Sequence, residues 1–325
     1  MSVQMKNGGI PPKISGNFYG KDFIEISQLN KEDVYKIFEQ AEEIREAYDS
    51  GSISDLKVNA RAAILFFQNS TRTYSSFNRA CQILGLDVFA EHGMSAFSLA
   101  MKGEFLRRTI QSIYQTQMLT AGDVIIMRHP DTNSSHIAAS AVDASIVNAG
   151  SGSLRHPTQA LLDLYTIWKD IKNLNNIELI FMGDLKFGRT VKSLGSLISM
   201  VGKNIKINLV SPDICSLPDK LREEWEEAGV KTTQTTDVLY VTRLQQEWFE
   251  KSNMMNEYNK IKADYIIDYE LIKKAKNNTL LMHPLPSNGE MEDPKLDEYA
   301  GARYLNQMKN GTLVRSALIR QITKK

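Results

Sequence analysis

The segment at residues 62–84, AAILFFQNSTRTYSSFNRACQIL, constrains the fold of this chain more than any other. Residues 63–67 are an apolar run with the length and composition of a buried strand. Residues 69–71 indicate a turn, because short polar side chains hydrogen-bond to nearby backbone. Apolar residues then recur at helical spacing up to Gly85, which is typical of a helix end. The segment therefore predicts a buried strand followed directly by a helix, as in α/β folds.

Ser70, Thr71, Arg72 and Thr73 lie where this strand gives way to the helix. Free backbone N–H groups, the positive end of the helix dipole, hydroxyl groups and a guanidinium converge at such a junction. This combination predicts an anion site, and phosphate is the anion that suits it best. The same residues also fit an ordinary helix N-cap with a surface arginine, so the segment alone leaves both interpretations open.

The strand-and-helix pattern recurs along the chain, and 325 residues are enough for two domains. Strands are expected at residues 88–89, 124–127, 146–148, 177–182, 205–210, 238–242 and 280–282. Helices are expected between Asn30 and Gly51, at 105–118, from Pro157 onward, and at 191–201, 217–228 and 304–322, with Gly311 as a candidate break. The pattern predicts the α/β class.

Composition excludes several classes of function. The 39 basic and 38 acidic residues nearly balance, so no electrostatic argument supports nucleic acid or an anionic membrane as a partner. Cys81 and Cys215 have neither metal-ligand spacing nor a disulfide framework. The first residues lack an apolar signal region, and no run approaches membrane-spanning length. We therefore expect a soluble, cytoplasmic globular protein.

Polar residues follow several of the expected strands. Arg128 comes at the end of the strand at 124–127, and ligands of open α/β sheets bind at the carboxyl ends of strands. His156 and Gln159 lie near a helix start after a glycine-bearing turn, where a structural and a functional histidine are about equally expected. Arg189 follows another strand-to-helix turn, which lacks the G-x-G-x-x-G spacing of a dinucleotide site.

Seven short motifs, in this order along the chain, resemble those of the aspartate carbamoyltransferases, in the aspartate/ornithine carbamoyltransferase superfamily. They are NSTRT at 69–73, SLAMKGE at 98–104, MRHP at 127–130, HPTQALLDL at 156–164, GDLKFGRT at 183–190, TRLQ at 242–245 and HPLP at 283–286. STRT and HPTQ resemble motifs of carbamoyltransferases in general, which use carbamoyl phosphate. The GRT and TRLQ segments point to aspartate, not ornithine, as the acceptor.

The resemblance implies a role for each residue that matches a carbamoyl phosphate motif. The residues implied to bind carbamoyl phosphate are Ser70, Thr71, Arg72, Thr73, Arg128, His156, Gln159, Pro284 and Leu285. Of these, Arg72, Thr73, Arg128 and His156 are the implied catalytic residues. Thr73, Arg128 and His156 would stabilise the oxyanion, while Gln159 and the carbonyls of Pro284 and Leu285 would accept from the carbamoyl amide.

The resemblance also implies an aspartate site and a shared active site. Arg189 would bind the α-carboxylate and Arg243 the β-carboxylate, with Gln245 beside them and Lys102 adding positive charge. Ser98 and Lys102 would reach in from the neighbouring subunit of a homotrimer. They lie in the segment at 91–104, which by itself reads equally as a solvated surface loop. No metal or cofactor is implied, and whether regulatory chains bind is left open.

Two domains follow from the resemblance, each with a mainly parallel sheet flanked by helices. Residues 1–155 and 304–325 would form the carbamoyl-phosphate-binding domain, to which the C-terminal helix returns. Residues 156–303 would form the aspartate-binding domain.

Three departures from the family pattern keep alternatives open. Tyr74 stands where the family often has arginine, Ser287 replaces the usual arginine after HPLP, and residues 230–236 are too few for a strand and a regular crossover. One alternative is a carbamoyltransferase with a different amine acceptor. The other is a non-catalytic assembly subunit of the same fold, against which the presence of every implied site residue argues.

Overall fold

The computed structural model describes residues 11–94, 104–152, 156–231, 236–276 and 278–325. The chain divides into two compact units, and each is described by itself. Unit 1 comprises residues 1–162 and 308–325, and unit 2 comprises residues 163–307. Across the described residues, none of the helices is both long enough and apolar enough to cross a membrane.

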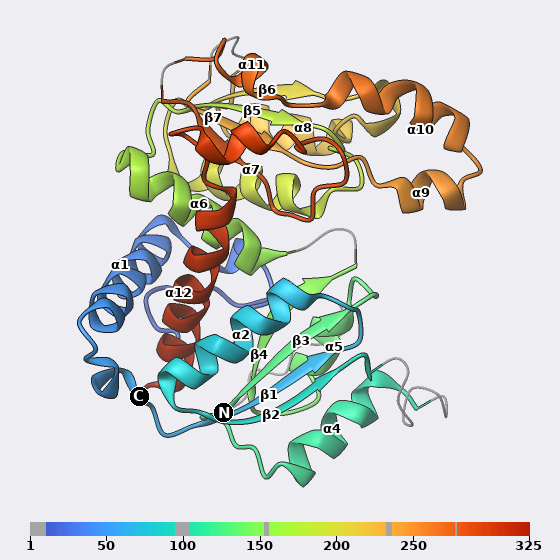
Figure 1. Ribbon diagram of the computed structural model, residues 1–325. Coiled ribbons are helices and arrows are strands. Elements are labelled where there is room, and N and C mark those ends of the chain that lie inside the picture. Colours follow the sequence, from blue (N-terminus) through green and yellow to red (C-terminus); the bar gives the residue numbers. More distant parts are fainter. Residues whose placement is uncertain (1–10, 95–103, 153–155, 232–235, 277) are drawn as a thin grey trace. The chain divides into compact units, whose positions relative to one another are not determined.

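Unit 1 is built on a parallel sheet with the strand order β2-β1-β3-β4 (Figure 1). Its strands are β1 (Arg61–Phe66), β2 (Asp87–His92), β3 (Val124–His129) and β4 (Ser145–Ser151). Its helices include α1 (Lys31–Asp49), α2 (Thr71–Leu84), α4 (Leu106–Thr116) and α5 (Ser134–Ala139). These elements confirm the strands and helices predicted in the first part of the chain.

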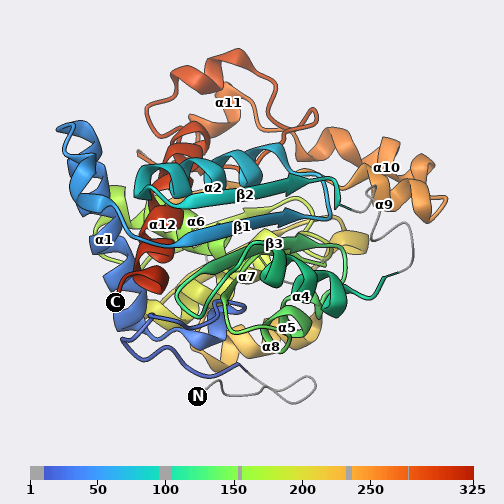
Figure 2. The same cartoon turned by 90° about the horizontal axis from the view of Figure 1, so that it is seen from below.

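The core of unit 1 follows the alternation of side chains along the strands. Ala63 and Leu65 of β1 pack in one cluster with Ile125 of β3, Ile110 of α4 and Ala138 of α5. Figure 2 shows α4 and α5 side by side next to β3. Ala62 and Ile64, which alternate with Ala63 and Leu65 and point to the other face of the sheet, are buried as well, so both faces of the sheet are covered.

Helix α1 begins as predicted, because the side chain of Asn30 accepts from the amide of Asp33 and the Asp33 carboxylate accepts from the amide of Asn30. Its apolar face buries Val34 and Phe38. Tyr48 is 43% exposed. It lies in the last turn of the helix, beyond the buried residues.

Unit 2 repeats the architecture with the strand order β6-β5-β7-β8. Its strands are β5 (Glu178–Met182), β6 (Lys206–Val210), β7 (Val238–Val241) and β8 (Leu280–Met282). Its helices include α7 (Arg189–Val201), α8 (Asp219–Glu227), α9 (Gln246–Lys251), α10 (Met255–Ile261) and α11 (Tyr269–Ile272). Short 3₁₀ helices lie at Ile26–Gln28 and Ile53–Leu56 in unit 1 and at Asp213–Cys215, Lys262–Tyr265 and Pro294–Glu298 in unit 2.

Lys231, in the short segment at 230–236, lies at the sheet edge beside β6. Lys231 makes an isolated parallel bridge to Lys206, donating to the carbonyl of Ile205 and accepting from the amide of Ile207. Residues 232–235 lie outside the described part of the chain. Among the described residues, the edge position beside β6 is therefore occupied by an isolated bridge and not by a regular strand.

The long helices α6 (Pro157–Ile171) and α12 (Tyr304–Thr323) contain the points where the chain passes from one unit to the other. The predicted break at Gly311 is wrong, since α12 continues through it. A Cβ at Gly311 would lie 3.1 Å from Leu162, so the glycine permits close packing in unit 1. The end of α12 returns to unit 1 as predicted, with Arg320 donating to Gln40 at 2.9 Å.

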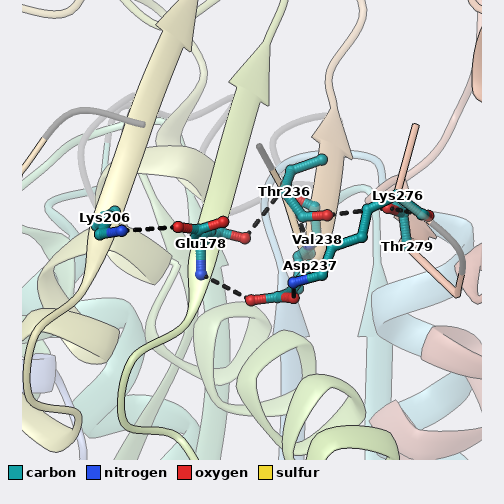
Figure 3. A network of polar contacts seen from close by, with 7 residues as sticks. All are labelled: Glu178, Lys206, Thr236, Asp237, Val238, Lys276 and Thr279. Atoms are coloured by element: carbon teal, nitrogen blue, oxygen red, sulfur yellow. Dashed lines mark hydrogen bonds and ion pairs between the residues drawn. The ribbon is translucent and has the colours of Figure 1, made fainter. Parts of the chain in front are cut away.

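A polar network ties together the amino ends of the strands in unit 2 (Figure 3). The carboxylate of Asp237 accepts from the amide of Glu178 at 3.0 Å and pairs with Lys276 at 2.6 Å. The side chain of Glu178 pairs with Lys206 at 2.8 Å. The network therefore crosses from β6 through β5 to the residues that precede β7 and β8.

We expect Asp237→Ala to lower the free energy of unfolding by about 1–3 kcal/mol, because the amide of Glu178 loses its partly buried acceptor. Lys276→Gln removes only a half-exposed ion pair and should cost less than about 1 kcal/mol. Chemical denaturation of both variants measures the difference. Equal losses for the two variants would contradict a principal role for the Asp237–Glu178 hydrogen bond.

Candidate active site

The predicted site residues of unit 1 follow the carboxyl ends of its strands. Phe66, which ends β1, is in register with His92 of β2 on one side and with Arg128 of β3 on the other. Residues 70–73 follow β1, and His156 follows β4. The parallel register thus brings segments far apart in the sequence to one edge of this sheet.

Ser70 is the residue before α2, with an extended backbone, and its side chain makes no capping hydrogen bond to the helix. The expectation of an ordinary side-chain N-cap is therefore not met at Ser70. Thr71 and Arg72 are exposed, whereas Thr73 is buried. The first turn of a fourteen-residue helix consequently presents amides, a hydroxyl and a guanidinium at the carboxyl edge of the sheet.

Tyr74 packs against aromatic neighbours at the point where the family often has arginine. Its ring lies edge-on to Phe66 and His92, with centroids 5.4 and 5.0 Å away. The His92 Nε2 atom accepts from the amide of Ser70 at 3.3 Å. His92 could not be identified from the sequence, because this contact depends on the pairing of β1 with β2.

Arg128 and His156 meet in unit 1. The pairing of β3 with β4 shifts register between Met127 and His129, an irregularity of the kind that re-aims a side chain. Arg128 Nη1 lies 3.4 Å from the carbonyl oxygen of Ala149 and 3.4 Å from His156 Nε2. Since arginine only donates, His156 accepts at Nε2 in this contact.

His156 and Gln159 are both buried, and the amide of Gln159 donates to the carbonyl of His156 at 3.0 Å. This contact lies at the start of α6, with His156 directly before the helix and Gln159 in its first turn. Ser98 and Lys102, by contrast, lie outside the described residues.

In unit 2, the turn after β5 packs against the end of β7. Gly183 has φ +109°, and a Cβ there would lie 1.9 Å from the carbonyl oxygen of Thr242, so only glycine fits. The buried Asp184 accepts from the amides of Lys186 and Phe187 at 3.1 and 2.8 Å. Burial raises the pKa of Asp184, although backbone amides that include that of Gln245 oppose the rise.

Asp184 therefore links the two segments that carry the predicted aspartate ligands, residues 183–190 and 242–245. Asp184 was not among the site residues predicted from the sequence. A glycine and an acidic residue in succession after a buried strand were the signal that would have found it.

Arg189 is the first residue of α7, and burial lowers the pKa of its guanidinium to about 10. An anionic ligand would compensate for such burial, because it favours the charged form.

Arg243, after β7, is engaged by Glu247 of α9. Its two terminal nitrogens donate to the Glu247 carboxylate at 2.9 and 2.5 Å. The hydrogen bond raises the pKa of Arg243 and holds the pKa of Glu247 below its ordinary value. The guanidinium therefore already binds one carboxylate in the two-point manner predicted for a substrate.

The position of the segment after β8 is stabilised by a hydrogen bond to the side chain of His283. The amide of Leu285 donates to His283 Nδ1 at 2.8 Å, while Pro284 and Leu285 are half-buried. Ser287, at the position of the family's arginine, donates to Glu292 at 3.1 Å. In unit 2, the three predicted segments thus follow adjacent strands in the order β5-β7-β8.

Two family models match the chain in succession. The aspartate/ornithine carbamoyltransferase carbamoyl-P binding domain matches residues 21–169, and the Asp/Orn binding domain of the same family matches residues 175–322. Together they account for most of the chain.

Relatives of known name agree with these matches. The aspartate carbamoyltransferase catalytic subunit of Methanopyrus kandleri is 36% identical over 93% of this chain and 97% of its own length. The multifunctional protein URA2 of Saccharomyces cerevisiae is 39% identical over 97% of this chain, which spans only 14% of that protein.

Solved structures show the same likeness. An aspartate transcarbamoylase from Trypanosoma cruzi in complex with carbamoyl phosphate and aspartate superposes with a TM-score of 0.84 at 33% identity, covering 97% of this chain and 99% of the other. The catalytic subunit of M. jannaschii aspartate transcarbamoylase gives a TM-score of 0.82 at 34% identity, covering 93% of this chain and 97% of the other.

Gly183→Ala should displace the segment at 242–245, because the added methyl would meet the Thr242 carbonyl. We expect a loss of more than about 2 kcal/mol in the free energy of unfolding, larger than backbone strain alone. Gly289→Ala is the matched control, since Gly289 has φ +101° with nothing within 4 Å of the Cβ position. Similar unfolding midpoints for the two variants would show that the contact with Thr242 is unimportant.

Proposed function

The chain belongs to the aspartate/ornithine carbamoyltransferase family, and we propose that it transfers the carbamoyl group of carbamoyl phosphate to the amine of L-aspartate. The products are N-carbamoyl-L-aspartate and phosphate, in the synthesis of pyrimidines. The observation that carries the proposal is the placement of Arg189 and Arg243 after the adjacent strands β5 and β7. Two guanidinium groups suit the two carboxylates of aspartate.

Carbamoyl phosphate is assigned to residues at the carboxyl edge of the sheet in unit 1. Ser70, Thr71, Arg72 and Thr73 would bind the phosphate through amides, hydroxyls and one guanidinium. This role is supported by the first turn of α2, where Ser70 forms no side-chain cap and Thr71 and Arg72 are exposed.

The oxyanion is assigned to Thr73, Arg128 and His156. The amine of aspartate attacks the carbonyl carbon, a C–N bond forms, and the bond to the phosphate oxygen then breaks. The departing phosphate takes the proton from the amine. Negative charge builds on the carbonyl oxygen between these steps, so donors held in place beforehand lower the barrier most. The placement of Arg128 Nη1 3.4 Å from His156 Nε2 supports their joint assignment.

The carbamoyl amide is assigned to acceptors, namely Gln159 and the carbonyls of Pro284 and Leu285. Gln245 would assist the two arginines at the acceptor. Arg243 also disfavours ornithine, whose side chain carries a positive charge that would face a guanidinium. A different anionic acceptor is the second candidate, because Ser287 and the sheet edge at Lys231 alter unit 2 where the family pattern differs.

A homotrimer with shared sites completes the proposal, with Ser98 and Lys102 acting in the site of the neighbouring subunit. Regulatory chains are not part of the proposal.

Arg128→Ala should lower kcat by about 100-fold or more, a far larger effect than its effect on substrate affinity, because the guanidinium acts mainly when the oxyanion forms. Arg243→Ala should instead raise the KM for aspartate. Steady-state kinetics with phosphate release as the readout separates the two effects. A near-normal kcat in the Arg128 variant would refute its assignment.

Arg72→Ala and Lys102→Ala should each be nearly inactive alone and should complement each other after dissociation and mixed reassembly. Equal random mixing gives roughly a quarter of sites with an intact Arg72 from one chain and an intact Lys102 from the next, by counting under threefold symmetry. Subunit exchange is verified with differently tagged chains. Mixed trimers that remain inactive would show that Lys102 acts within its own subunit.

A further inference from the structure

Unit 2 contains a continuous hydrogen-bonded chain of buried polar residues that the proposed reaction does not use. Its members come from three elements, α6, β7 and α12, and from the segment after β8, and their exposed fractions are all 8% or less. They are Glu290, His283, Gln307, Asp163 and Tyr240. Burying so many polar groups is costly unless each one is hydrogen-bonded, so their arrangement calls for a specific reason.

The contacts in this chain, the buried relay, are short. Glu290 Oε1 lies 2.8 Å from His283 Nε2, and the amide of His283 donates to Gln307 Oε1 at 2.9 Å. Gln307 Nε2 donates to Asp163 Oδ1 at 2.7 Å, and the hydroxyl of Tyr240 donates to Asp163 Oδ2 at 2.7 Å.

The direction of each hydrogen bond is determined by chemistry. Because His283 Nδ1 accepts from the amide of Leu285, its ring proton is on Nε2 and is donated to Glu290. Gln307 uses its oxygen toward His283 and its nitrogen toward Asp163, so both ends of the amide are engaged. Burial opposes ionisation of Glu290, but the contact with His283 and the amide of Asn288 together hold its pKa below the ordinary value.

The relay connects segments that carry proposed site residues. At one end, His283 accepts from the amide of Leu285 and directly precedes Pro284. The carbonyls of Pro284 and Leu285 are the ones assigned to the carbamoyl amide. At the other end, Tyr240 belongs to the strand that leads to Arg243 and also hydrogen-bonds the side chain of Thr190, next to Arg189. Gln307 is the middle member, since it joins the His283 backbone to Asp163.

We propose that Gln307 is a positioning residue for carbamoyl recognition, acting through His283 to hold the carbonyls of Pro284 and Leu285 at fixed places. This inference rests on the proposed function. An apolar side chain of similar size would fill the same space, but it would leave the His283 amide without its acceptor and Asp163 without one donor. The 283–285 segment would then lose its fixed position while the arginines stay in place.

The test compares two acyl phosphates. Carbamoyl phosphate has an amide that can donate to the carbonyls, whereas acetyl phosphate has a methyl group there and cannot use them. In Gln307→Met, calorimetry should show the Kd of carbamoyl phosphate raised about three- to tenfold, as expected for one weakened hydrogen bond. The Kd of acetyl phosphate should change less than about twofold.

Gln321→Met is the matched control, because Gln321 lies in the same helix α12 and donates instead to the carbonyl of Lys36 in unit 1. It should change neither dissociation constant. Tyr240→Phe removes one hydroxyl from the far end of the relay. It should also raise the Kd of carbamoyl phosphate more than the Kd of acetyl phosphate, by a smaller factor than Gln307→Met does. It decides the question if Gln307→Met does not fold.

Equal weakening of both ligands, or no weakening of either, would overturn the positioning role. A wild-type protein that binds the two acyl phosphates equally would overturn it too, because the carbonyls would then not be engaged. Failure of the proposed function is a separate result, seen as absent carbamoyl transfer by the wild-type protein.

Discussion

Parallel strand pairing is the constraint on which both units depend. In a parallel sheet every strand ends at the same edge, so segments far apart in the sequence are brought together by register alone. In unit 1 this register aligns Phe66 with His92 and Arg128. In unit 2 it aligns Met182 with Val241, directly before the turn that leads to Arg189 and the segment of Arg243. The positions of the candidate site residues within each unit therefore follow from the order and register of the strands.

The arginine side chains at these sheet edges are positioned by contacts with specific neighbouring residues. Arg243 is bound at two points by Glu247, and Arg128 approaches both Ala149 and His156. Guanidinium groups fixed in this way lose little further side-chain entropy when a substrate binds. Preorganised donors are what a reaction with a developing oxyanion requires, which links the local packing to the proposed chemistry.

Local sequence patterns predicted the helices and strands. The features that could not be predicted depend on contacts between residues far apart in the sequence. The helix α2 could be placed because apolar periodicity ends at Gly85, which has φ +69° as a left-handed cap. Gly311 was wrongly predicted to break the helix. A glycine is present there because Leu162 packs close to it, and that contact cannot be seen in the sequence. The buried relay could not be predicted, since Gln307 and Asp163 are 144 residues apart. The site motifs could be predicted as strand ends, but their hydrogen-bond partners could not.

The acceptor is the central claim, and a transfer assay with a panel of amines tests it most directly. Purified protein is given ¹³C-labelled carbamoyl phosphate with L-aspartate, L-ornithine or neutral amino acids, and products are followed by NMR. The account predicts N-carbamoyl-L-aspartate with stoichiometric release of phosphate, and little or no product from the other amines. Faster transfer to ornithine or to a neutral amine, or no transfer to any amine, would contradict it.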